Sequence, residues 1–434
     1  YDGGMSTLPA PNPQPMMDLA REAGLDESLI EMYGRNKAKI DLSALERPAQ
    51  GKGRLILVTA INPTPAGEGK TTTSIGLGMG MRRLGKRAVL ALREPSLGPV
   101  FGVKGGGTGG GRATLVPADD INLHFTGDLH AITTAHNLLS AMIDNACHFN
   151  QTPGDKGAID PRQITWGRTL DMNDRALRNV IVGLGQKTDG VPRHERFDIT
   201  AASEVMAILA LSTSHADLEA RLGRIVVGTS STGAAITAAD VGASAAMTAL
   251  MRDALKPNLV QTAEGGPALV HAGPFGNIAH GCNSVIATRL AVSLGDYAIT
   301  EAGFGFDLGG EKFLNIKCRN MGVFPRMIVL VATLRALKMH GGVPVKSAGE
   351  VDAAALERGL DHLDKHLETA QHYGLPVLVA INVFPNDTKE EIALVEAAVQ
   401  KRGGRVAVSE GFGRGGEGSL DLARAAVEMA DATD

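Results

Sequence analysis

The amino-acid sequence predicts an α/β fold: a mainly parallel sheet flanked by helices, with a second, smaller α/β domain. The chain has 434 residues, 44% of them apolar, so it can bury a large core and exceeds the size at which single cores stop growing. Its strand-sized apolar runs lack polar alternation, as strands do when a sheet is buried on both faces. Helix-length segments separate most of these runs, which is the pattern of crossover connections between parallel strands.

Composition and charge exclude several classes of protein. Lys plus Arg number 43 and Asp plus Glu 47, a net charge of −4, so no bulk attraction to nucleic acid is expected. No apolar stretch approaches the ~20 residues of a membrane span. The three cysteines lie far apart without a Cys-x-x-Cys pair, which favours reduced thiols over disulfides or structural zinc. We expect a cytoplasmic, enzyme-sized protein without nucleic-acid or membrane partners.

The order of patterns along the chain predicts three regions. Four prolines between positions 9 and 15 disfavour regular structure, so residues 1–50 are expected to form an extended and helical lead-in. Residues 51–365 are expected to form the main domain and residues 366–434 the second α/β domain. The expected strands are 54–61, 87–92, 224–228, 268–271, 297–301, 327–332 and 376–382.

The strongest local signal is a glycine-containing loop between the first of these strands and a helix expected over 70–84. It consists of Thr64, Pro65, Ala66, Gly67, Glu68, Gly69, Lys70, Thr71 and Thr72. Glycines let backbone N–H groups turn toward phosphate oxygens, and the lysine and the helix N-terminus add positive charge. The sequence therefore predicts a P-loop NTPase-like fold in which these nine residues bind ATP. Thr71 is predicted to hold magnesium.

This motif departs from the common pattern at its first position, where Thr stands in place of Gly. The alternative interpretation is a strand-to-helix turn that contains Gly-Lys-Thr by chance. Gly76 and Gly80 lie one turn further along the helix, on one face, and predict close packing of that helix against the sheet. Their spacing is wrong for the Gly-x-Gly-x-x-Gly fingerprint, which excludes a dinucleotide-binding fold.

Two further segments predict charged groups near the loop. Arg93 follows the second strand, whose end lies beside the phosphate loop in a doubly wound sheet. Its planar guanidinium suits a γ-phosphate, a carboxylate or an acyl phosphate; an exposed arginine is the alternative. The glycine-rich run 105–111 favours a lid or phosphate-side loop over a linker. Asp128 precedes a helix expected over 129–145, where it either lines the site or caps the helix.

Longer motifs resemble those of one enzyme family. They include TPAGEGKTT, REPSLGP, DINLHFTGD, KPNLVQT, GPFGNIAHGCNSVIAT, EAGFGFDLGGEKF, RALKMHGG and GRGGEG. From about residue 17 to residue 430 the chain resembles formate–tetrahydrofolate ligase (formyltetrahydrofolate synthetase), an enzyme of one-carbon metabolism. The resemblance implies that ATP, formate and tetrahydrofolate give 10-formyltetrahydrofolate, ADP and phosphate through formyl phosphate. It also implies magnesium, a monovalent cation (potassium or ammonium) and a homotetramer.

By the same resemblance, individual residues take roles. Lys70 matches the phosphate-binding lysine, and Arg93 and Asp128 match positions near the formyl phosphate; we count these three as catalytic. Phe384 matches one of two aromatic residues that sandwich the pterin of the folate. Phe412 stands where the family usually has tryptophan, and the single tryptophan of the chain, Trp166, lies elsewhere. Core packing is the alternative role for both phenylalanines.

Family members continue by roughly a domain's worth, ~100 residues, beyond the point that matches Asp434. We therefore expect the C-terminal portion of the family to be absent from this chain. Two alternative functions follow from that expectation. The chain could be a P-loop ATP-binding protein without ligase activity, or a structural subunit of a longer enzyme.

Overall fold

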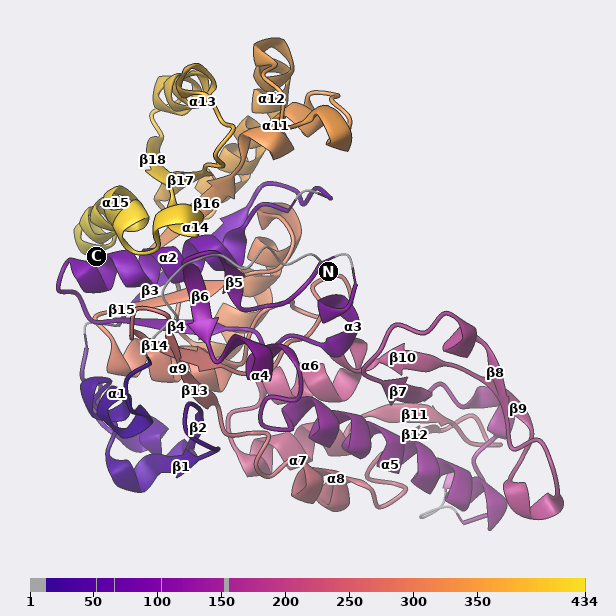
Figure 1. The fold of residues 1–434 in the computed structure, drawn as a ribbon. Helices are drawn as coiled ribbons and strands as arrows, with labels where there is room; N and C mark the ends of the chain where they lie inside the picture. The colour runs from indigo at the N-terminus through magenta and orange to yellow at the C-terminus, as the bar shows by residue number, and fades with distance from the viewer. Residues whose placement is uncertain (1–12, 52, 66, 103, 152–155, 434) are drawn as a thin grey trace.

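A large sheet runs through the centre of the molecule (Figure 1). The computed structural model describes residues 13–51, 53–65, 67–102, 104–151 and 156–433. Within them, seven neighbouring strands of this sheet run parallel, which confirms a mainly parallel sheet flanked by helices. In spatial order they are β14 (Pro267–Val270), β4 (Ala88–Leu92), β15 (Tyr297–Glu301), β3 (Arg54–Ala60), β16 (Met327–Ala332), β17 (Val377–Asn382) and β18 (Arg405–Ser409).

Beyond β14 the sheet becomes antiparallel. β13 pairs with β14 on one side and with β2 and β6 on the other, while β1 and β5 extend β2 and β6. The sequence did not predict these strands, because most are only two to four residues long. Their bounds are β1 (Ile30–Met32), β2 (Ala38–Ile40), β5 (Gly109–Gly110), β6 (Ala113–Val116) and β13 (Asn258–Thr262).

The two faces of the sheet pack into two separate cores. In β3, Leu55 and Leu57 belong to one core and Ile56 and Val58 to the other, and all four side chains are buried. Burial on both faces explains the absence of polar alternation in the strands. The first core includes residues of α9 (Val285–Leu294), α12 (Ala353–Gln371) and α13 (Lys389–Lys401); the second includes residues of α2 (Lys70–Arg83) and α15 (Leu420–Ala432).

Residues 156–250 and the long helix before them form an arm that extends to one side of the sheet (Figure 1). The expected strand 224–228 lies here as β11, in an antiparallel pair with β12, so its assignment to the parallel sheet was wrong. Such a short apolar run fits a hairpin as well as a buried strand. The arm comprises α5 (Asp128–His148), β7 (Arg168–Leu170), β8 (Val180–Val182), β9 (Arg193–Glu195), β10 (Phe197–Ile199), α6 (Glu204–Leu211), α7 (His215–Gly223), β11 (Val226–Thr229), β12 (Ala235–Thr237) and α8 (Ser244–Leu250).

The glycines of α2 allow close contacts on two sides of that helix. A Cβ on Gly78 would lie 3.1 Å from Leu90 of the sheet, as expected for helix–sheet packing. Gly76 and Gly80, however, lie against Ser419. A Cβ on Gly76 would lie 2.6 Å from the Ser419 hydroxyl, and a Cβ on Gly80 would lie 2.8 Å from the Ser419 carbonyl oxygen. The prediction that these two glycines face the sheet was therefore wrong: they face the short helical turn before α15.

The predicted boundary between residues 365 and 366 falls within α12, and strands on both sides of it belong to the same sheet. The three-region division stays a prediction, and most of the proline-rich start lies outside the described residues. None of the described helices has the length and apolar character needed to cross a membrane. The remaining α-helices are α1 (Met16–Glu22), α3 (Leu97–Val100), α4 (Ala118–Asn122), α10 (Arg319–Met321), α11 (Leu334–His340) and α14 (Gly411–Arg414).

Candidate functional site

Most of the predicted site residues follow the carboxyl ends of parallel strands. Lys70 follows β3, Arg93 follows β4, Phe384 follows β17 and Phe412 follows β18. Since parallel strands end at a common edge, the topology brings segments far apart in the sequence to one side of the sheet. This edge is where open α/β sheets bind their ligands.

The phosphate loop is a tight turn that depends on two glycines. Gly67 and Gly69 both have φ of +74°, in the left-handed region. A Cβ on Gly69 would also lie 2.3 Å from the side-chain nitrogen of Asn382, at the end of β17. The backbone N–H of Thr64 donates to Oε1 of Glu68 at 2.6 Å, so a buried carboxylate braces the turn from inside. Ala66, predicted to bind ATP, lies outside the described residues.

Lys70 begins α2 and is largely buried, with 14% of its side chain exposed. Its Nζ lies 3.8 Å from Oε2 of Glu68. Burial lowers the pKa of Lys70, the carboxylates of Glu68 and Glu301 oppose that shift, and the charge of Arg93 adds to it. The ammonium is thus held in a partly desolvated position, where its attraction to an anion is stronger than in water.

Glu301, the last residue of β15, connects two of the predicted residues. Its Oε2 accepts a 2.9 Å hydrogen bond from the Thr71 hydroxyl, and its Oε1 lies 3.8 Å from Nε of Arg93. A Cβ on Gly303 would lie 2.9 Å from an Arg93 nitrogen, so the neighbouring glycine leaves room for the guanidinium. Sequence reasoning missed the role of Glu301. The available signal was a carboxylate at the end of a predicted strand, inside the EAGFG motif.

The oxygen atoms at this point fit a magnesium ion. Mg²⁺ is usually bound by one or two protein oxygens together with substrate phosphates, and the Thr71 hydroxyl beside the Glu301 carboxylate provides such a set. In the part of the chain that the structure describes, no group of three or more His, Cys, Asp or Glu residues could hold a metal ion by itself. The donor set therefore fits a cation that is shared with phosphate.

A third cationic side chain, that of Lys104, lies near Lys70, Arg93 and Glu301. It precedes the glycine-rich run and is exposed. The positive charge of Arg93, followed by partial desolvation, lowers the pKa of Lys104 to about 8, and Lys70 contributes in the same direction. Lys104 therefore adds positive charge to the region of Arg93, Lys70 and Glu301. The sequence did not indicate a role for Lys104, because a single lysine before a glycine-rich run is not specific to a phosphate site.

The glycine-rich run is anchored by contacts at both ends. A Cβ on Gly107 would lie 2.9 Å from Pro95, and one on Gly111 would lie 2.1 Å from the carbonyl oxygen of Phe412. That carbonyl also accepts a 2.9 Å hydrogen bond from the N–H of Arg112. The run therefore connects the segment after β4 to the segment after β18. These contacts favour a loop beside the site over a free linker.

Asp128 lies in a different environment from the one expected for a helix cap. Gly127 occupies the N-cap position of α5, and Asp128 is its first helical residue. Its carboxylate is buried and pairs with Nζ of Lys39 at 2.8 Å and with the Asn258 amide at 2.7 Å. Burial, and then the charge of Asp128, raise the pKa of Glu94 well above its usual range. The charge of Asp128 therefore acts on Glu94, the residue that follows Arg93.

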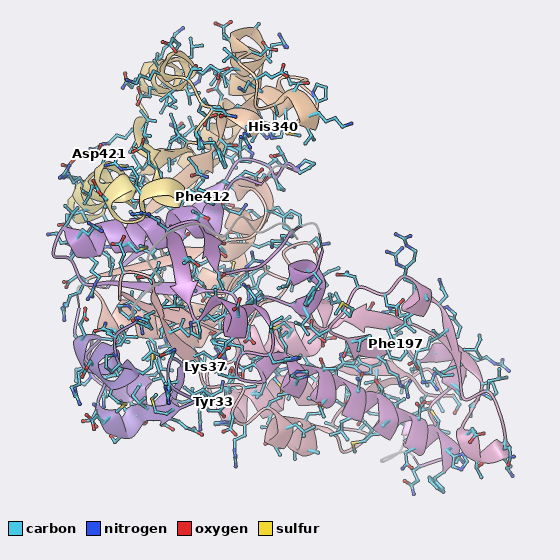
Figure 2. The ribbon with its side chains drawn as sticks, in the orientation of Figure 1. Tyr33, Lys37, Phe197, His340, Phe412 and Asp421 are labelled. Carbon is cyan, nitrogen blue, oxygen red and sulfur yellow. The ribbon has the colours of Figure 1, made fainter. Side chains whose placement is uncertain are left out.

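The two predicted pterin-stacking residues differ in exposure. Phe384 is half-buried, with the Arg335 guanidinium 4.6 Å from its ring centre. Phe412, in α14, is 47% exposed (Figure 2). Both rings follow neighbouring parallel strands, so both lie at the carboxyl edge. By contrast, the single tryptophan, Trp166, is buried and stacks on His136 with ring centres 4.1 Å apart, which is core packing.

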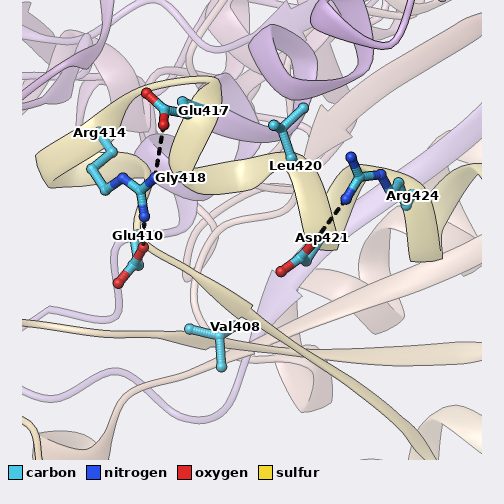
Figure 3. A pocket seen from close by; sticks show the side chains of 8 residues that line it. All are labelled: Val408, Glu410, Arg414, Glu417, Gly418, Leu420, Asp421 and Arg424. Atoms are coloured by element: carbon cyan, nitrogen blue, oxygen red, sulfur yellow. Dashed lines mark hydrogen bonds and ion pairs between the residues drawn. The ribbon is translucent and has the colours of Figure 1, made fainter.

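Two cavities in the described part of the chain contain none of the predicted site residues in their linings. One, of about 240 Å³, lies near α14 and α15 (Figure 3). Its charged groups are paired with each other: Arg414 with Glu410 and Glu417, and Arg424 with Asp421. The other, of about 400 Å³, lies at the base of the arm; its lining includes Leu170, Met172, Phe197, Phe275 and Ile278.

Comparisons with known proteins agree with the resemblance. The family model for formate–tetrahydrofolate ligase matches residues 7–434. A formate–tetrahydrofolate ligase from Myxococcus xanthus is 59% identical over 419 residues, covering 96% of this chain and 75% of that protein. Those from Methylobacillus flagellatus and Paracoccus denitrificans are 56% and 57% identical, with 95% and 96% of this chain covered and 74% and 75% of theirs.

The expectation about the family's C-terminal portion stays a prediction. The match itself extends over nearly the whole chain and includes the phosphate loop, the Arg93 segment and the strand that ends at Glu301. The chain belongs to the formate–tetrahydrofolate ligase family.

Proposed function

We propose that this chain ligates formate to tetrahydrofolate in an ATP-driven reaction at the carboxyl edge of its sheet, giving 10-formyltetrahydrofolate, ADP and phosphate. The observation that carries the proposal is the position of Glu301 between Thr71 and Arg93. The Thr71 hydroxyl, which follows β3, and the Arg93 guanidinium, which follows β4, both lie beside the Glu301 carboxylate at the end of β15, the strand between them. That is the arrangement needed for activating a carboxylate with a phosphoryl group.

The nucleotide is held by the loop of the nine predicted residues, 64–72, in a P-loop NTPase-like manner. The helix N-terminus at Lys70 and the left-handed glycines favour phosphate oxygens there. Thr71 and Glu301 would hold the magnesium ion, which would neutralise phosphate charge when bound. Lys104 adds a further positive charge near these residues.

In the first step, Lys70 and Arg93 stabilise the negative charge on the γ-phosphoryl oxygens. A formate oxygen forms a bond to the γ-phosphorus while the bond from that phosphorus to the ADP oxygen breaks, which gives formyl phosphate and ADP. The Arg93 fork can contact formate and phosphoryl oxygens together. Asp128 acts through Glu94, the residue after Arg93, and sets the charge behind the guanidinium.

In the second step, Phe384 and Phe412 hold the pterin between their rings. The N10 amine of the folate attacks the formyl carbon, the bond from that carbon to the phosphate oxygen breaks, and phosphate leaves with the proton that N10 loses. The two rings supply position, which accelerates a reaction between two bound groups. The smaller area of Phe412 compared with tryptophan weakens this grip.

The resemblance adds two features to the proposal. A monovalent cation, potassium or ammonium, stimulates the reaction, and the chain assembles as a homotetramer; cytoplasmic localisation is proposed from the cysteine pattern instead. The principal test is an assay of ADP release that depends on both formate and tetrahydrofolate. We expect Lys70→Ala to lower this rate at least ~100-fold, while Lys401→Ala, at an exposed position in α13, leaves it unchanged.

Two results would contradict the proposal. ADP release that does not depend on formate would exclude the ligase reaction. Calorimetry that detects ATP binding but no tetrahydrofolate binding would support the alternative, an ATP-binding protein without ligase activity.

A further inference from the structure

Lys317 is a fully buried lysine, with 0% of its side chain exposed, in the helical turn Phe313–Cys318. Its Nζ donates to Oδ1 of Asn283 at 3.0 Å and to the hydroxyl of Thr288 at 2.7 Å. Both acceptors are neutral. Burying an ammonium without a carboxylate partner destabilises the folded chain. The two neutral acceptors of Lys317 therefore suggest that the lysine is kept for a reason other than stability.

Two other buried lysines of the described chain show the usual arrangement. Lys39 pairs with Asp128 at 2.8 Å, and Lys338 pairs with Glu391 at 3.2 Å. Both of these ion pairs are almost completely buried. Lys317 is as buried as Lys39 and Lys338, but its hydrogen-bond acceptors are neutral groups rather than carboxylates.

The contacts of Lys317 fix the orientation of one amide. Oδ1 of Asn283 accepts from Lys317 and also from the Thr288 hydroxyl at 2.8 Å. Its Nδ2 donates to the carbonyl oxygen of Ala91 at 2.6 Å and to the Thr300 hydroxyl at 2.7 Å. With a cation on its oxygen, the amide can present only its nitrogen toward the sheet.

The groups on the nitrogen side belong to the two strands that carry the site. Ala91 lies in β4, two residues before Arg93, and Thr300 lies in β15, directly before Glu301. Ala91 and Thr300 are partners in the strand register, and the Thr300 hydroxyl donates to the Ala91 carbonyl at 3.0 Å. The network therefore ends at the base of the Arg93–Glu301 pair.

We propose that Lys317 is a positioning residue for the ligase site: its ammonium orients the Asn283 amide, which holds the carboxyl ends of β4 and β15 together so that Arg93 and Glu301 meet. The inference rests on the proposed function. It assigns no contact between Lys317 and substrate. Its effect on the reaction passes through the placement of the guanidinium and of the carboxylate beside Thr71.

The test compares two variants of the full chain, each of which removes a buried lysine. Lys317→Met keeps the length of the side chain but loses the ammonium, and Lys338→Met does the same at the lysine that pairs with Glu391. Both variants are expected to lower the thermal midpoint. Only Lys317→Met is expected to raise the KM for formate, by roughly tenfold or more, and to weaken Mg-ATP binding in calorimetry by a similar factor.

Asn283→Asp separates amide orientation from charge balance. It supplies a carboxylate for Lys317 but removes the Nδ2 donor to Ala91 and Thr300. We expect it to raise the KM for formate as Lys317→Met does. If charge balance alone matters, this variant keeps a normal KM, and the inference is wrong.

Further outcomes are decisive. Equal KM for formate and equal ATP affinity in Lys317→Met and the unaltered chain overturn the inference, as does an equal loss in Lys338→Met.

If Lys317→Met does not fold, Thr288→Val removes one acceptor of Lys317 and should raise the KM for formate less strongly; an unchanged KM overturns the inference. Absence of formate-dependent ADP release in the unaltered chain contradicts the proposed function instead, and ATP affinity still tests the inference.

Discussion

The hydroxyl of Thr71 donates a 2.9 Å hydrogen bond to the carboxylate of Glu301, although 230 positions separate the two residues. The bond joins the helix after β3 to the end of β15, the strand next to β3 in the sheet. It places a hydroxyl and a carboxylate, both hard oxygen donors, at one point of the carboxyl edge.

Replacement of the Thr71 hydroxyl should raise the magnesium requirement. Thr71→Val keeps the shape of the side chain but removes the oxygen donor, so we expect the Mg²⁺ concentration for half-maximal activity to rise at least ~10-fold. Thr71→Ser keeps the hydroxyl and serves as the matched control. Measurement of ADP release over a Mg²⁺ titration checks this. Equal titration curves for the Val and Ser variants would show that Thr71 does not hold the metal.

Replacement of Arg93 by lysine should remove most of the activity. A point ammonium keeps the charge but cannot reproduce the two parallel donors of the guanidinium. We expect kcat/KM for formate to fall by roughly 100-fold. Arg424→Lys, in an exposed ion pair with Asp421, should change little. Near-normal turnover of the Arg93→Lys variant would exclude Arg93 from the mechanism.

Changes at Phe412 should act on folate binding. Phe412→Ala removes the stacking face, so the KM for tetrahydrofolate should rise roughly 2- to 10-fold, in line with the ~0.5–1.5 kcal/mol of an aromatic pair. Phe412→Trp enlarges that face and should lower the KM. The hydrogen bond from Arg112 involves the backbone of Phe412 and is retained in both variants.

A matched control for Phe412 is available at another exposed ring. Phe149 is 59% exposed at the end of α5, and Phe149→Ala should leave the KM for tetrahydrofolate unchanged. Steady-state kinetics with varied tetrahydrofolate measure all three variants. If Phe412→Ala and Phe149→Ala have the same KM, Phe412 is a surface residue without a role in folate binding.

The buried Glu94 predicts a pH-dependent stability. Burial and the charge of Asp128 raise its pKa in the folded state above the ordinary 4.5. The folded chain then binds a proton that the unfolded chain has lost. The stability that Glu94 contributes is fully present below pH 4.5 and is lost as the pH rises through the raised pKa.

Glu94→Gln isolates this effect, because the amide is neutral at every pH. We expect the thermal midpoint of Glu94→Gln, relative to the unaltered chain, to increase as the pH rises from 4.5 toward neutral. The difference should be smallest at the acid end. A difference between the two chains that is constant with pH would mean that Glu94 titrates normally in the folded state.

The parallel strands could be predicted from the sequence, because burial on both faces leaves a continuous apolar run that is visible without any partner. The strands 297–301 and 327–332 match β15 and β16 in both bounds. The short antiparallel strands at the other edge could not be predicted. Two- to four-residue strands such as β5 and β6 depend on pairing with distant segments and carry almost no periodic signal of their own.

Candidate site residues could be named from the sequence where a local motif carries the chemistry, and their roles stay predictions. Lys70 and Thr71 follow from the loop, and Arg93 follows from the end of the next strand. Glu301 and Lys317 do not follow from local patterns, because their importance lies in contacts with residues that are far away in the sequence. A carboxylate that ends a strand and a lysine inside a helical turn are ordinary until the fold shows what they touch.

The order of the strands also sets a distance between the parts of the proposed site. Neighbouring strands lie about 4.8 Å apart, and β15 and β17 are separated by β3 and β16, so the strand of Glu301 and the strand leading to Phe384 are about 14 Å apart. Backbone ladders, rather than a hinge, fix this spacing. Insertions or deletions in the connecting helices would therefore leave the distance between the ends of β15 and β17 unaltered, so the sheet alone sets the spacing between the proposed phosphoryl and folate parts of the edge.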